Sequence, residues 1–311
     1  MRSLVAALAA VLALLMPSLA CAQSLEVDEL AAAMKSARWT GPMLASNAET
    51  LPRGHFYTEP YFYDVILGSD HHPGSSGFYQ YGLLDNLTVG LQPSFATATN
   101  RLDRGMAIGD FKLLSQLRLT HFRPDRQIPT IALVVNEVIP TGKDDNLRPS
   151  QEGHGSGAFA TEVGLNVQQY FLLGNGRLLR ARINVLQRFS GRTGVSGRSV
   201  YGTGPEFRGH ARIGPKTTLI GAFEYSLTNE WVLALDVEAD FAGRTTIWGR
   251  ETSGGPLVRR TSSASRDIGF APAVEYNWSP KTGVLLGVWI IPKGHNTPSS
   301  VTPAIAISRF W

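Results

Sequence analysis

The stretch WVLALDVEADF, residues 231–241, decides the fold class. Its odd positions carry only apolar side chains, with an aromatic ring at each end. Its even positions include the carboxylates Asp236, Glu238 and Asp240. Successive side chains of a β-strand point to opposite faces, so this alternation predicts a strand with one apolar face and one acidic face.

The same period of two recurs in four other windows: 110–121, 158–171, 180–189 and 267–278. A soluble sandwich also alternates, so alternation alone leaves two architectures open. Strands of globular proteins most often have about five or six residues, whereas a tilted strand needs about 9–11 to cross a bilayer. The length of these windows therefore favours a membrane barrel. After residue 22, no stretch reaches the ~18 apolar residues that a spanning helix needs.

The connections between the predicted strands alternate between short turns and long polar loops. Together with a first strand near 54–67 and a last at 301–311, they give about twelve strands. This arrangement is typical of an outer-membrane barrel with its short turns in the periplasm. We therefore predict an all-β protein, a transmembrane antiparallel up-and-down β-barrel with a short N-terminal helix. The short turns fall at 84–86, 123–127, 174–176, 229–230 and 280–282, and the long loops near 68–77, 100–107, 141–155, 191–216, 243–265 and 294–300.

Residues 1–22 have the pattern of a secretory signal peptide. An apolar run at 4–16 precedes a small-x-small cleavage pattern at 20–22. A lipoprotein signal ending at Cys21 is the alternative, but Ser18 stands where that signal needs an aliphatic residue. The sequence thus predicts export and residence in the outer membrane of a Gram-negative cell.

Residues 23–53 are expected to form a helical, plug-like segment before the barrel of residues 54–311. Leu30 and Met34 mark the apolar face of a short amphipathic helix, which a Gly-Pro pair at 41–42 ends. Such a segment could enter the barrel as a plug or lie outside it in the periplasm. The sequence leaves both positions open and slightly favours partial occlusion, because the helix has an apolar face to bury.

Composition excludes several classes of function. The formal net charge is +4 with a pI near 9.3, but no block of Lys and Arg accompanies it, so we expect no nucleic-acid partner. A single cysteine excludes a disulfide framework and a cysteine-based metal site. No phosphate loop or dinucleotide fingerprint follows a predicted strand, so we expect no cofactor and no metal.

Three short motifs occur in an order that resembles a known family. They are GDFK at 109–112, VIPTG at 138–142 and TPAIAIS at 302–308. The resemblance covers roughly residues 54–311 and is to the transporter-like outer-membrane proteins labelled "meta-pathway of phenol degradation". It implies a barrel for passive or facilitated uptake of small molecules, aromatic and hydrophobic ones among them. It supplies no catalytic residues.

The C-terminal strand suggests a further partner. Apolar residues alternate from Val301 to Ile307, and the chain ends on Trp311. Outer-membrane proteins resemble this ending, whose terminal aromatic residue is read by the barrel-assembly machinery; Arg309 departs from the pattern. The predicted partners are therefore outer-membrane lipid, the barrel-assembly machinery through the last strand, and a small-molecule solute.

If the apolar face meets lipid, the opposite face of each strand lines the lumen. The basic candidates come from the windows at 110–121 and 180–189, and the acidic ones from 231–241 and 267–278. We expect the two signs to face each other across the pore as a transverse field, which would select polar solutes at a constriction. The alternative is that they pair and fill a narrow interior. The pore-lining candidates are Lys112, Arg118, Arg180, Arg182, Arg188, Asp236, Glu238, Asp240, Asp267 and Glu275.

Two other functions remain open. One is a structural or surface-binding barrel without transport. The other, which we consider weak, is a lipid hydrolase using His154 and Ser156, because a His–Ser pair also needs an orienting group and an oxyanion donor. Adjacent His71 and His72 after Asp70 fit a solvated loop better than a metal site. We assign no catalytic residue and expect no enzyme.

Overall fold

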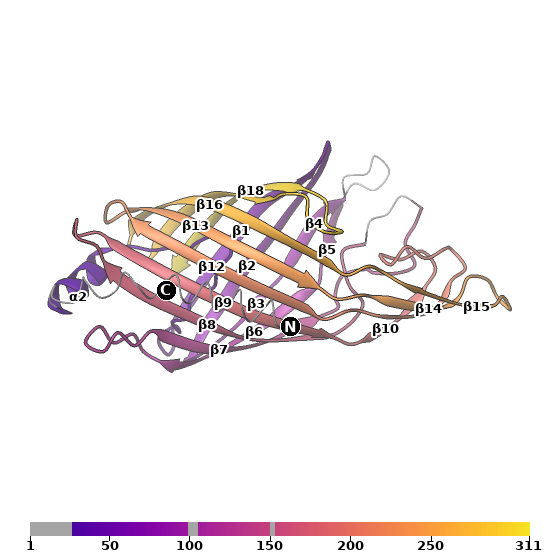
Figure 1. Cartoon of the computed structure of the whole chain (residues 1–311), viewed down its shortest axis with the longest axis horizontal. Helices are drawn as coiled ribbons and strands as arrows, with labels where there is room; N and C mark the ends of the chain where they lie inside the picture. The colour runs from indigo at the N-terminus through magenta and orange to yellow at the C-terminus, as the bar shows by residue number, and fades with distance from the viewer. Residues whose placement is uncertain (1–26, 99–104, 150–152) are drawn as a thin grey trace.

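The computed structural model describes residues 27–98, 105–149 and 153–311, and within them it shows a closed antiparallel β-barrel with one α-helix near its N-terminus (Figure 1). This confirms the predicted fold class. The predicted signal peptide, residues 1–22, lies outside the described residues.

Twelve strands form the wall in the described part of the chain. β4 continues β3 beyond Pro93, and β5 leads into β6, so each of these pairs counts as one strand. The wall consists of β1 (Phe56–Leu67), β2 (Asp70–Leu84), β3 (Leu87–Gln92) with β4 (Ser94–Ala98), β5 (Gly105–Ile108) with β6 (Phe111–Thr120), β7 (Thr130–Ile139), β8 (Ala160–Leu172), β9 (Leu178–Ser190), β12 (Lys216–Ser226), β13 (Trp231–Ala242), β16 (Ser265–Ser279), β17 (Thr282–Ile291) and β18 (Ser300–Phe310).

β1 closes the barrel, because it pairs with β18 on one side and with β2 on the other. Tyr57 lies opposite Phe310, and the Trp311 amide donates to the Phe56 carbonyl at 2.9 Å. Arg309, the unusual residue of the last strand, places its guanidinium 4.7 Å from the centre of the Trp311 ring. Because β1 pairs on both sides, the wall has no open seam between its first and last strands, as a hydrocarbon environment requires.

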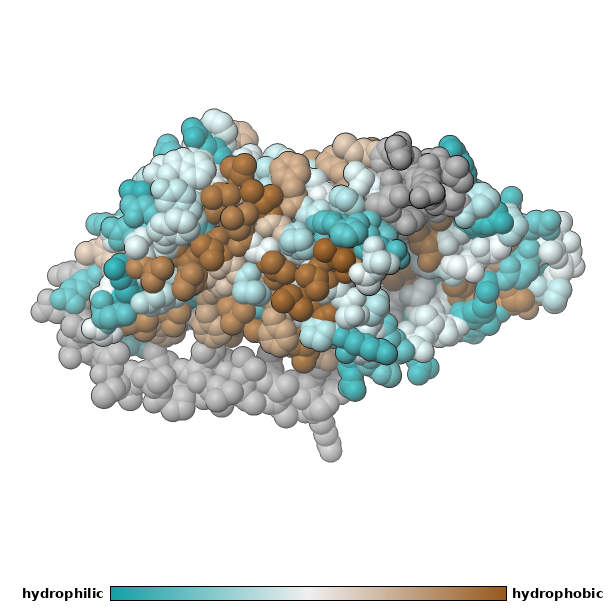
Figure 2. Space-filling view, turned by 90° about the horizontal axis from the view of Figure 1, so that it is seen from above, coloured by the Kyte–Doolittle hydropathy of each residue, from teal (hydrophilic) through white to brown (hydrophobic). Residues whose placement is uncertain are grey.

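The wall turns its apolar side outward. On β13, Trp231 and Leu235 are 44% and 42% exposed, while their neighbours Val232 and Asp236 are fully buried. Figure 2 shows hydrophobic residues gathered across the middle of one face of the barrel and hydrophilic ones toward its ends. A soluble barrel would have the reverse pattern, so this belt fits contact with lipid.

Four short strands continue the wall beyond one end of the barrel. They form a sheet in the order β10 (Arg192–Ser196), β11 (Arg208–Arg212), β14 (Thr246–Arg250) and β15 (Leu257–Thr261), which we call the extension sheet (Figure 1). The loops predicted at 191–216 and 243–265 are therefore partly strand. The sequence did not predict these strands, because their residues are mostly polar. Beyond the lipid, a strand needs backbone pairing but no apolar outer face.

One predicted loop is wrong. Residues 68–77 were expected to be a long polar loop, but a turn at Gly68 and Ser69 joins β1 directly to β2. Gly68 adopts a φ of +62°, which suits such a turn. The polar residues from Asp70 onward pair with β1 along its full length. We call the end of the barrel that carries this turn and the extension sheet the long-loop end.

The opposite, short-turn end carries the predicted turns near residues 85, 175, 229 and 281. The helix α2 (Val27–Ser36) comes directly before the residues that contact this end. There the Arg38 amide donates to the Asn229 carbonyl at 3.0 Å. In the part of the chain that the structure describes, no helix combines the length and apolar character needed to cross a membrane.

Candidate functional site

Residues 38–53, which we call the internal segment, run inside the barrel. They enter at the short-turn end, where Arg38 pairs with Glu230 at 3.3 Å. The Thr40 amide and hydroxyl then donate to the inward-facing carboxylate of Glu275 at 2.6 and 2.8 Å. A segment without secondary structure leaves its backbone N–H groups unpaired, so acceptors on the wall must satisfy them.

The deepest part of the internal segment is held in the same way. The amides of Leu44 and Ala45 donate to Asp236 at 3.2 and 3.0 Å. Ser46 exchanges two hydrogen bonds with the Asn184 side chain, at 2.7 and 3.1 Å. Wall side chains thus take the place of a neighbouring strand for this part of the chain.

The internal segment then returns to the short-turn end along the opposite wall. The Glu49 carboxylate accepts hydrogen bonds from Arg118 at 2.9 Å and from Thr130 at 2.5 Å. The Leu51 amide donates to the Thr88 hydroxyl at 2.8 Å. The segment is therefore an inward loop that occupies the half of the lumen nearer the short turns.

A buried ion cluster stands beside the loop. Arg180 and Arg182 of β9 are each 4% exposed, and both contact the fully buried Glu224 of the neighbouring strand β12. The Arg182 guanidinium also donates to the Ala45 carbonyl at 2.8 Å. The Arg180 guanidinium lies 4.5 Å from the centre of the Trp39 ring. The two arginines are thus paired and packed against the internal segment.

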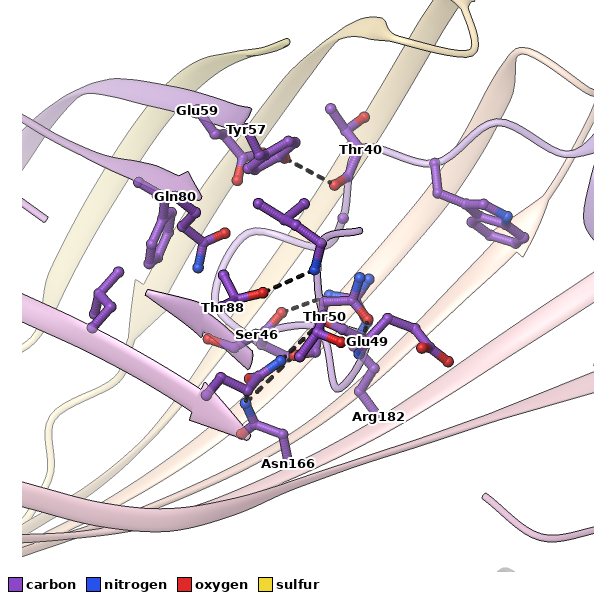
Figure 3. A pocket seen from close by; sticks show the side chains of 18 of the residues that line it. Thr40, Ser46, Glu49, Thr50, Tyr57, Glu59, Gln80, Thr88, Asn166 and Arg182 are labelled. Atoms are coloured by element: carbon purple, nitrogen blue, oxygen red, sulfur yellow. Dashed lines mark hydrogen bonds between the residues drawn. The ribbon is translucent and has the colours of Figure 1, made fainter. Parts of the chain in front are cut away.

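A cavity of about 330 Å³, the lower cavity, remains between the internal segment and the wall (Figure 3). Five aromatic side chains line it: Trp39, Tyr57, Tyr61, Phe78 and Phe310. The polar side of the cavity includes Thr88 and Asn166, which Figure 3 shows beside the internal segment. The cavity therefore combines aromatic surface with hydrogen-bonding groups, as small-molecule sites do.

An upper cavity of about 380 Å³ lies toward the long-loop end, and it is lined by charged groups. Lys112 and Arg188 reach it, and both bind Glu162 at 3.1 Å. Lys216 also lines it and pairs with Asp240 at 2.7 Å. These cations are between 22% and 38% exposed and thus partly solvated, whereas Arg180 and Arg182 of the buried ion cluster are each 4% exposed.

The two cavities follow one another along β7. Val134 and Asn136 line the lower cavity, and Val138, the next inward residue, lines the upper one. Inward positions on a strand are about 7 Å apart. The Asn136 side chain donates to Glu162 at 3.0 Å, which places the charged group of the upper cavity at the boundary between the two.

The ten pore-lining candidates lie on inward-facing positions, but in three different surroundings. Arg118, Asp236 and Glu275 hold the internal segment, and Arg180 and Arg182 form the buried ion cluster. The others belong to the half nearer the long loops, where Lys112 and Arg188 share Glu162, Asp240 pairs with Lys216, Glu238 lies beside Asp240, and Asp267 accepts a hydrogen bond from Thr297.

The expected placement of opposite charges across the barrel is found only in part. In the strand order, β6 with Lys112 and Arg118 lies across the barrel from β13 and β16, but β9 does not. β9, which carries the arginines, is separated from the acidic strand β13 by β12 alone, so the two do not face each other across the barrel. The cations instead pair with Glu224 and Glu162 on adjacent strands. These two glutamates belong to the alternative in which the lumen charges pair with neighbouring strands, whereas Lys216 and the internal segment are not among the ten pore-lining candidates. The strand at 216–226 alternates too, so its pattern could have revealed Lys216 and Glu224.

The hydrolase alternative receives no support from the geometry. The Ser156 hydroxyl donates to Asp110 at 2.7 Å and contacts the Ala158 carbonyl at 3.2 Å, so it is engaged away from His154. His71 pairs with Asp64 at 2.6 Å. Among the described residues, no three His, Cys, Asp or Glu side chains form a group that could hold a metal ion.

Comparison with known proteins agrees with this architecture. An outer-membrane channel of Pseudomonas putida F1 has a similar fold, with a TM-score of 0.58 and 12% identity over 86% of this chain and all of that one. The P. putida toluene transporter TodX aligns over 88% of this chain and 95% of its own with 13% identity, but its TM-score of 0.34 supports no conclusion. No family model and no curated protein matches the sequence.

Proposed function

We propose that this barrel is a passive channel in the outer membrane for the uptake of small molecules, aromatic and hydrophobic ones among them. The observation that carries the proposal is the succession of two cavities along β7, one beside the internal segment and one toward the long loops. The similarity to a solved outer-membrane channel supports it at the level of the fold.

The lining of the two cavities suggests which solutes the channel would favour. A cavity of about 330 Å³ is at the small end of the range for ligand sites, which fits a molecule of one ring. Tyr57, Tyr61 and Phe78 offer such a ring apolar contacts. The paired charges around Glu162 would admit a polar substituent, because their heads are partly solvated.

The competing proposal is a structural or surface-binding barrel without transport. The internal segment favours it, since this segment occupies much of the lower lumen. The two proposals differ in one measurable property: a channel passes solutes through the lower cavity, and a structural barrel does not.

The test is liposome swelling and single-channel conductance of the refolded protein with Val134→Trp and Val135→Trp. Val134 lines the lower cavity, whereas its neighbour Val135 is 44% exposed on the lipid side. An indole at 134 should reduce solute flux several-fold, and one at 135 should leave it unchanged. Equal flux in both variants, or no flux in the wild type, would favour the structural barrel.

We also propose an orientation: the long-loop end faces the outside of the cell and the short-turn end faces the periplasm. Outer-membrane barrels have their long loops outside and their short turns in the periplasm. Cys21 is the one cysteine of the sequence and lies in the predicted signal peptide, residues 1–22. After cleavage, a single introduced cysteine can therefore report the side of the membrane on which it lies. Ser253, in the turn between β14 and β15, should become labelled on intact cells as Ser253→Cys. Asn175→Cys, at the short-turn end, should label only after the outer membrane is opened; the opposite result would reverse the orientation.

A further inference from the structure

One inward-facing acid of the lower cavity does not hold the internal segment. Glu59 of β1 lines this cavity and is 7% exposed. Asp236 and Glu275 accept hydrogen bonds from amides of the internal segment, and Glu224 binds two guanidiniums. Among the described residues, by contrast, the Oε1 atom of Glu59 has no hydrogen-bond partner, and no cationic side chain forms an ion pair with Glu59.

Two arginines on nearby parts of the wall are engaged elsewhere. Arg309 of the adjacent strand β18 lies opposite Thr58, and its guanidinium lies over the ring of Trp311. Arg182, which also lines the lower cavity, contacts Glu224 and the internal segment. Buried polar groups are nearly always paired, and a buried charge without a partner costs free energy. Glu59 is therefore poised to accept a donor that enters the cavity.

The pairing of β1 with β2 surrounds Glu59 with aromatic side chains. Glu59 lies directly opposite Phe78, and its inward-facing neighbours along β1 are Tyr57 and Tyr61. The rings of Tyr61 and Phe78 meet edge to face, with their centres 6.4 Å apart. Gln80 lies opposite Tyr57, and Figure 3 shows it with Glu59 and Tyr57 at the wall of the cavity. We call these five residues the acidic corner.

The far side of the cavity adds a second unpaired acceptor. Asn166 belongs to β8, which lies across the barrel from β1 in the strand order, and it is 2% exposed. Its amide nitrogen donates to Gln116 at 2.8 Å, whereas its Oδ1 atom has no partner among the residues that the structure describes. Both Glu59 and Asn166 thus offer acceptors, so the cavity favours a solute that brings hydrogen-bond donors.

An ammonium group suits the acidic corner better than a neutral or an anionic group. It has three donors, it compensates the charge of a buried carboxylate, and it is attracted to the faces of aromatic rings. A hydroxyl group offers one hydrogen bond without the charge, and Glu59 would repel a carboxylate. The cavity volume of about 330 Å³ limits the rest of the solute to about one ring.

We propose that the lower cavity binds a single-ring organic amine in its protonated form. The ammonium group binds Glu59, and the ring packs among Tyr57, Tyr61 and Phe78. This inference rests on the proposed channel function, for which it names a class of solute. Binding to the acidic corner can nevertheless be measured without transport.

The experiment measures binding of three probes to the purified, detergent-solubilised protein by ligand-observed NMR titration at pH 7. Benzylamine, benzyl alcohol and benzoate share one ring and differ in the charge of the polar group. We expect benzylamine to bind at least about tenfold more tightly than benzyl alcohol, and benzoate to bind more weakly still. Glu59→Gln preserves the size of the side chain but removes its charge, so it should reduce the affinity for benzylamine to that for benzyl alcohol.

The matched control is Glu137→Gln, which removes the same charge from the outer side of β7. Glu137 lies between the inward-facing Asn136 and Val138 and accepts a hydrogen bond from the Thr161 hydroxyl. This variant should keep the preference for benzylamine. Equal binding of benzylamine and benzyl alcohol by the wild type, or a preference that survives in Glu59→Gln, would overturn the proposal. The wild-type comparison decides the question even if Glu59→Gln does not fold.

Liposome swelling with the same three solutes separates this inference from the proposed channel function. Flux of benzyl alcohol without preferential binding of benzylamine would support the channel and reject the amine site. Preferential binding of benzylamine without any flux would support the amine site and reject the channel.

Discussion

The two halves of the lumen use similar residues in opposite ways. Arg180 and Arg188 lie on the same face of β9, yet the first is 4% exposed and the second 35%. Near the short turns, the internal segment covers the charges and makes them part of a packed interior. Near the long loops, similar charges line a cavity. The strand face on which a charged residue lies therefore does not determine whether that residue is buried or solvated. The presence of the internal segment above it does.

Removal of Glu224 should show this difference most strongly. Glu224→Gln leaves two buried guanidiniums without their carboxylate, and breaking a buried pair costs about 3–5 kcal/mol. The control is Glu162→Gln in the upper half, where partly exposed partners limit the loss to about 1–2 kcal/mol. The free energy of unfolding in urea measures both. Equal losses would mean that the lower lumen is as hydrated as the upper one.

The outer face of the wall provides a second contrast. Leu235→Arg places a charge on the lipid side of β13, at a cost of about 2–4 kcal/mol near the middle of a bilayer. Ala242→Arg, on the same strand but lining the upper cavity, should be tolerated. Ala234 would be a poor control, because it packs with Tyr61 and Met43 in the filled half. The yield of heat-modifiable barrel measures the effect; similar yields for both variants would contradict the inward and outward assignment.

Asp236 tests whether the internal segment limits flux. Asp236→Ala removes the acceptor of the Leu44 and Ala45 amides, which should cost about 1–3 kcal/mol and loosen the deepest part of the segment. We expect a higher single-channel conductance as a result. Asp267→Ala is the control, since Asp267 binds Thr297 at the long-loop end instead. A stability loss without any gain in conductance would mean that the segment does not limit the path.

The sequence predicted the wall well and the contents of the lumen poorly, for a physical reason. The alternation at 231–241 arises because one face of the strand meets lipid and the other meets the interior. Each strand shows this pattern in its own sequence. Residues 38–53 carry no such period, because wall side chains such as Asp236 and Asn184 satisfy their backbone groups. Those contacts join residues more than 130 positions apart. The pairing of Arg180 with Glu224 likewise depends on which strands are neighbours, and this requires the strand at 216–226 to be recognised.

Variants of the upper cavity should have the smallest effect on stability, and they are also the most informative about function. Arg188→Ala/Lys216→Ala removes two partly solvated cations, and exposed pairs of this kind contribute less than about 1 kcal/mol each. Glu162 keeps Lys112 as a partner, and Asp240 keeps the Thr218 hydroxyl, so neither carboxylate is stranded.

With those carboxylates still present, the net charge of the upper cavity becomes more negative. The reversal potential in a salt gradient should therefore shift toward cation selectivity, and more so at low salt, where charges in the cavity are less screened. Arg123→Ala/Arg126→Ala, the same loss of charge at the short-turn end, should leave selectivity unchanged. If the upper-cavity variant loses stability while selectivity stays the same, its cations hold the wall together and do not act on passing ions.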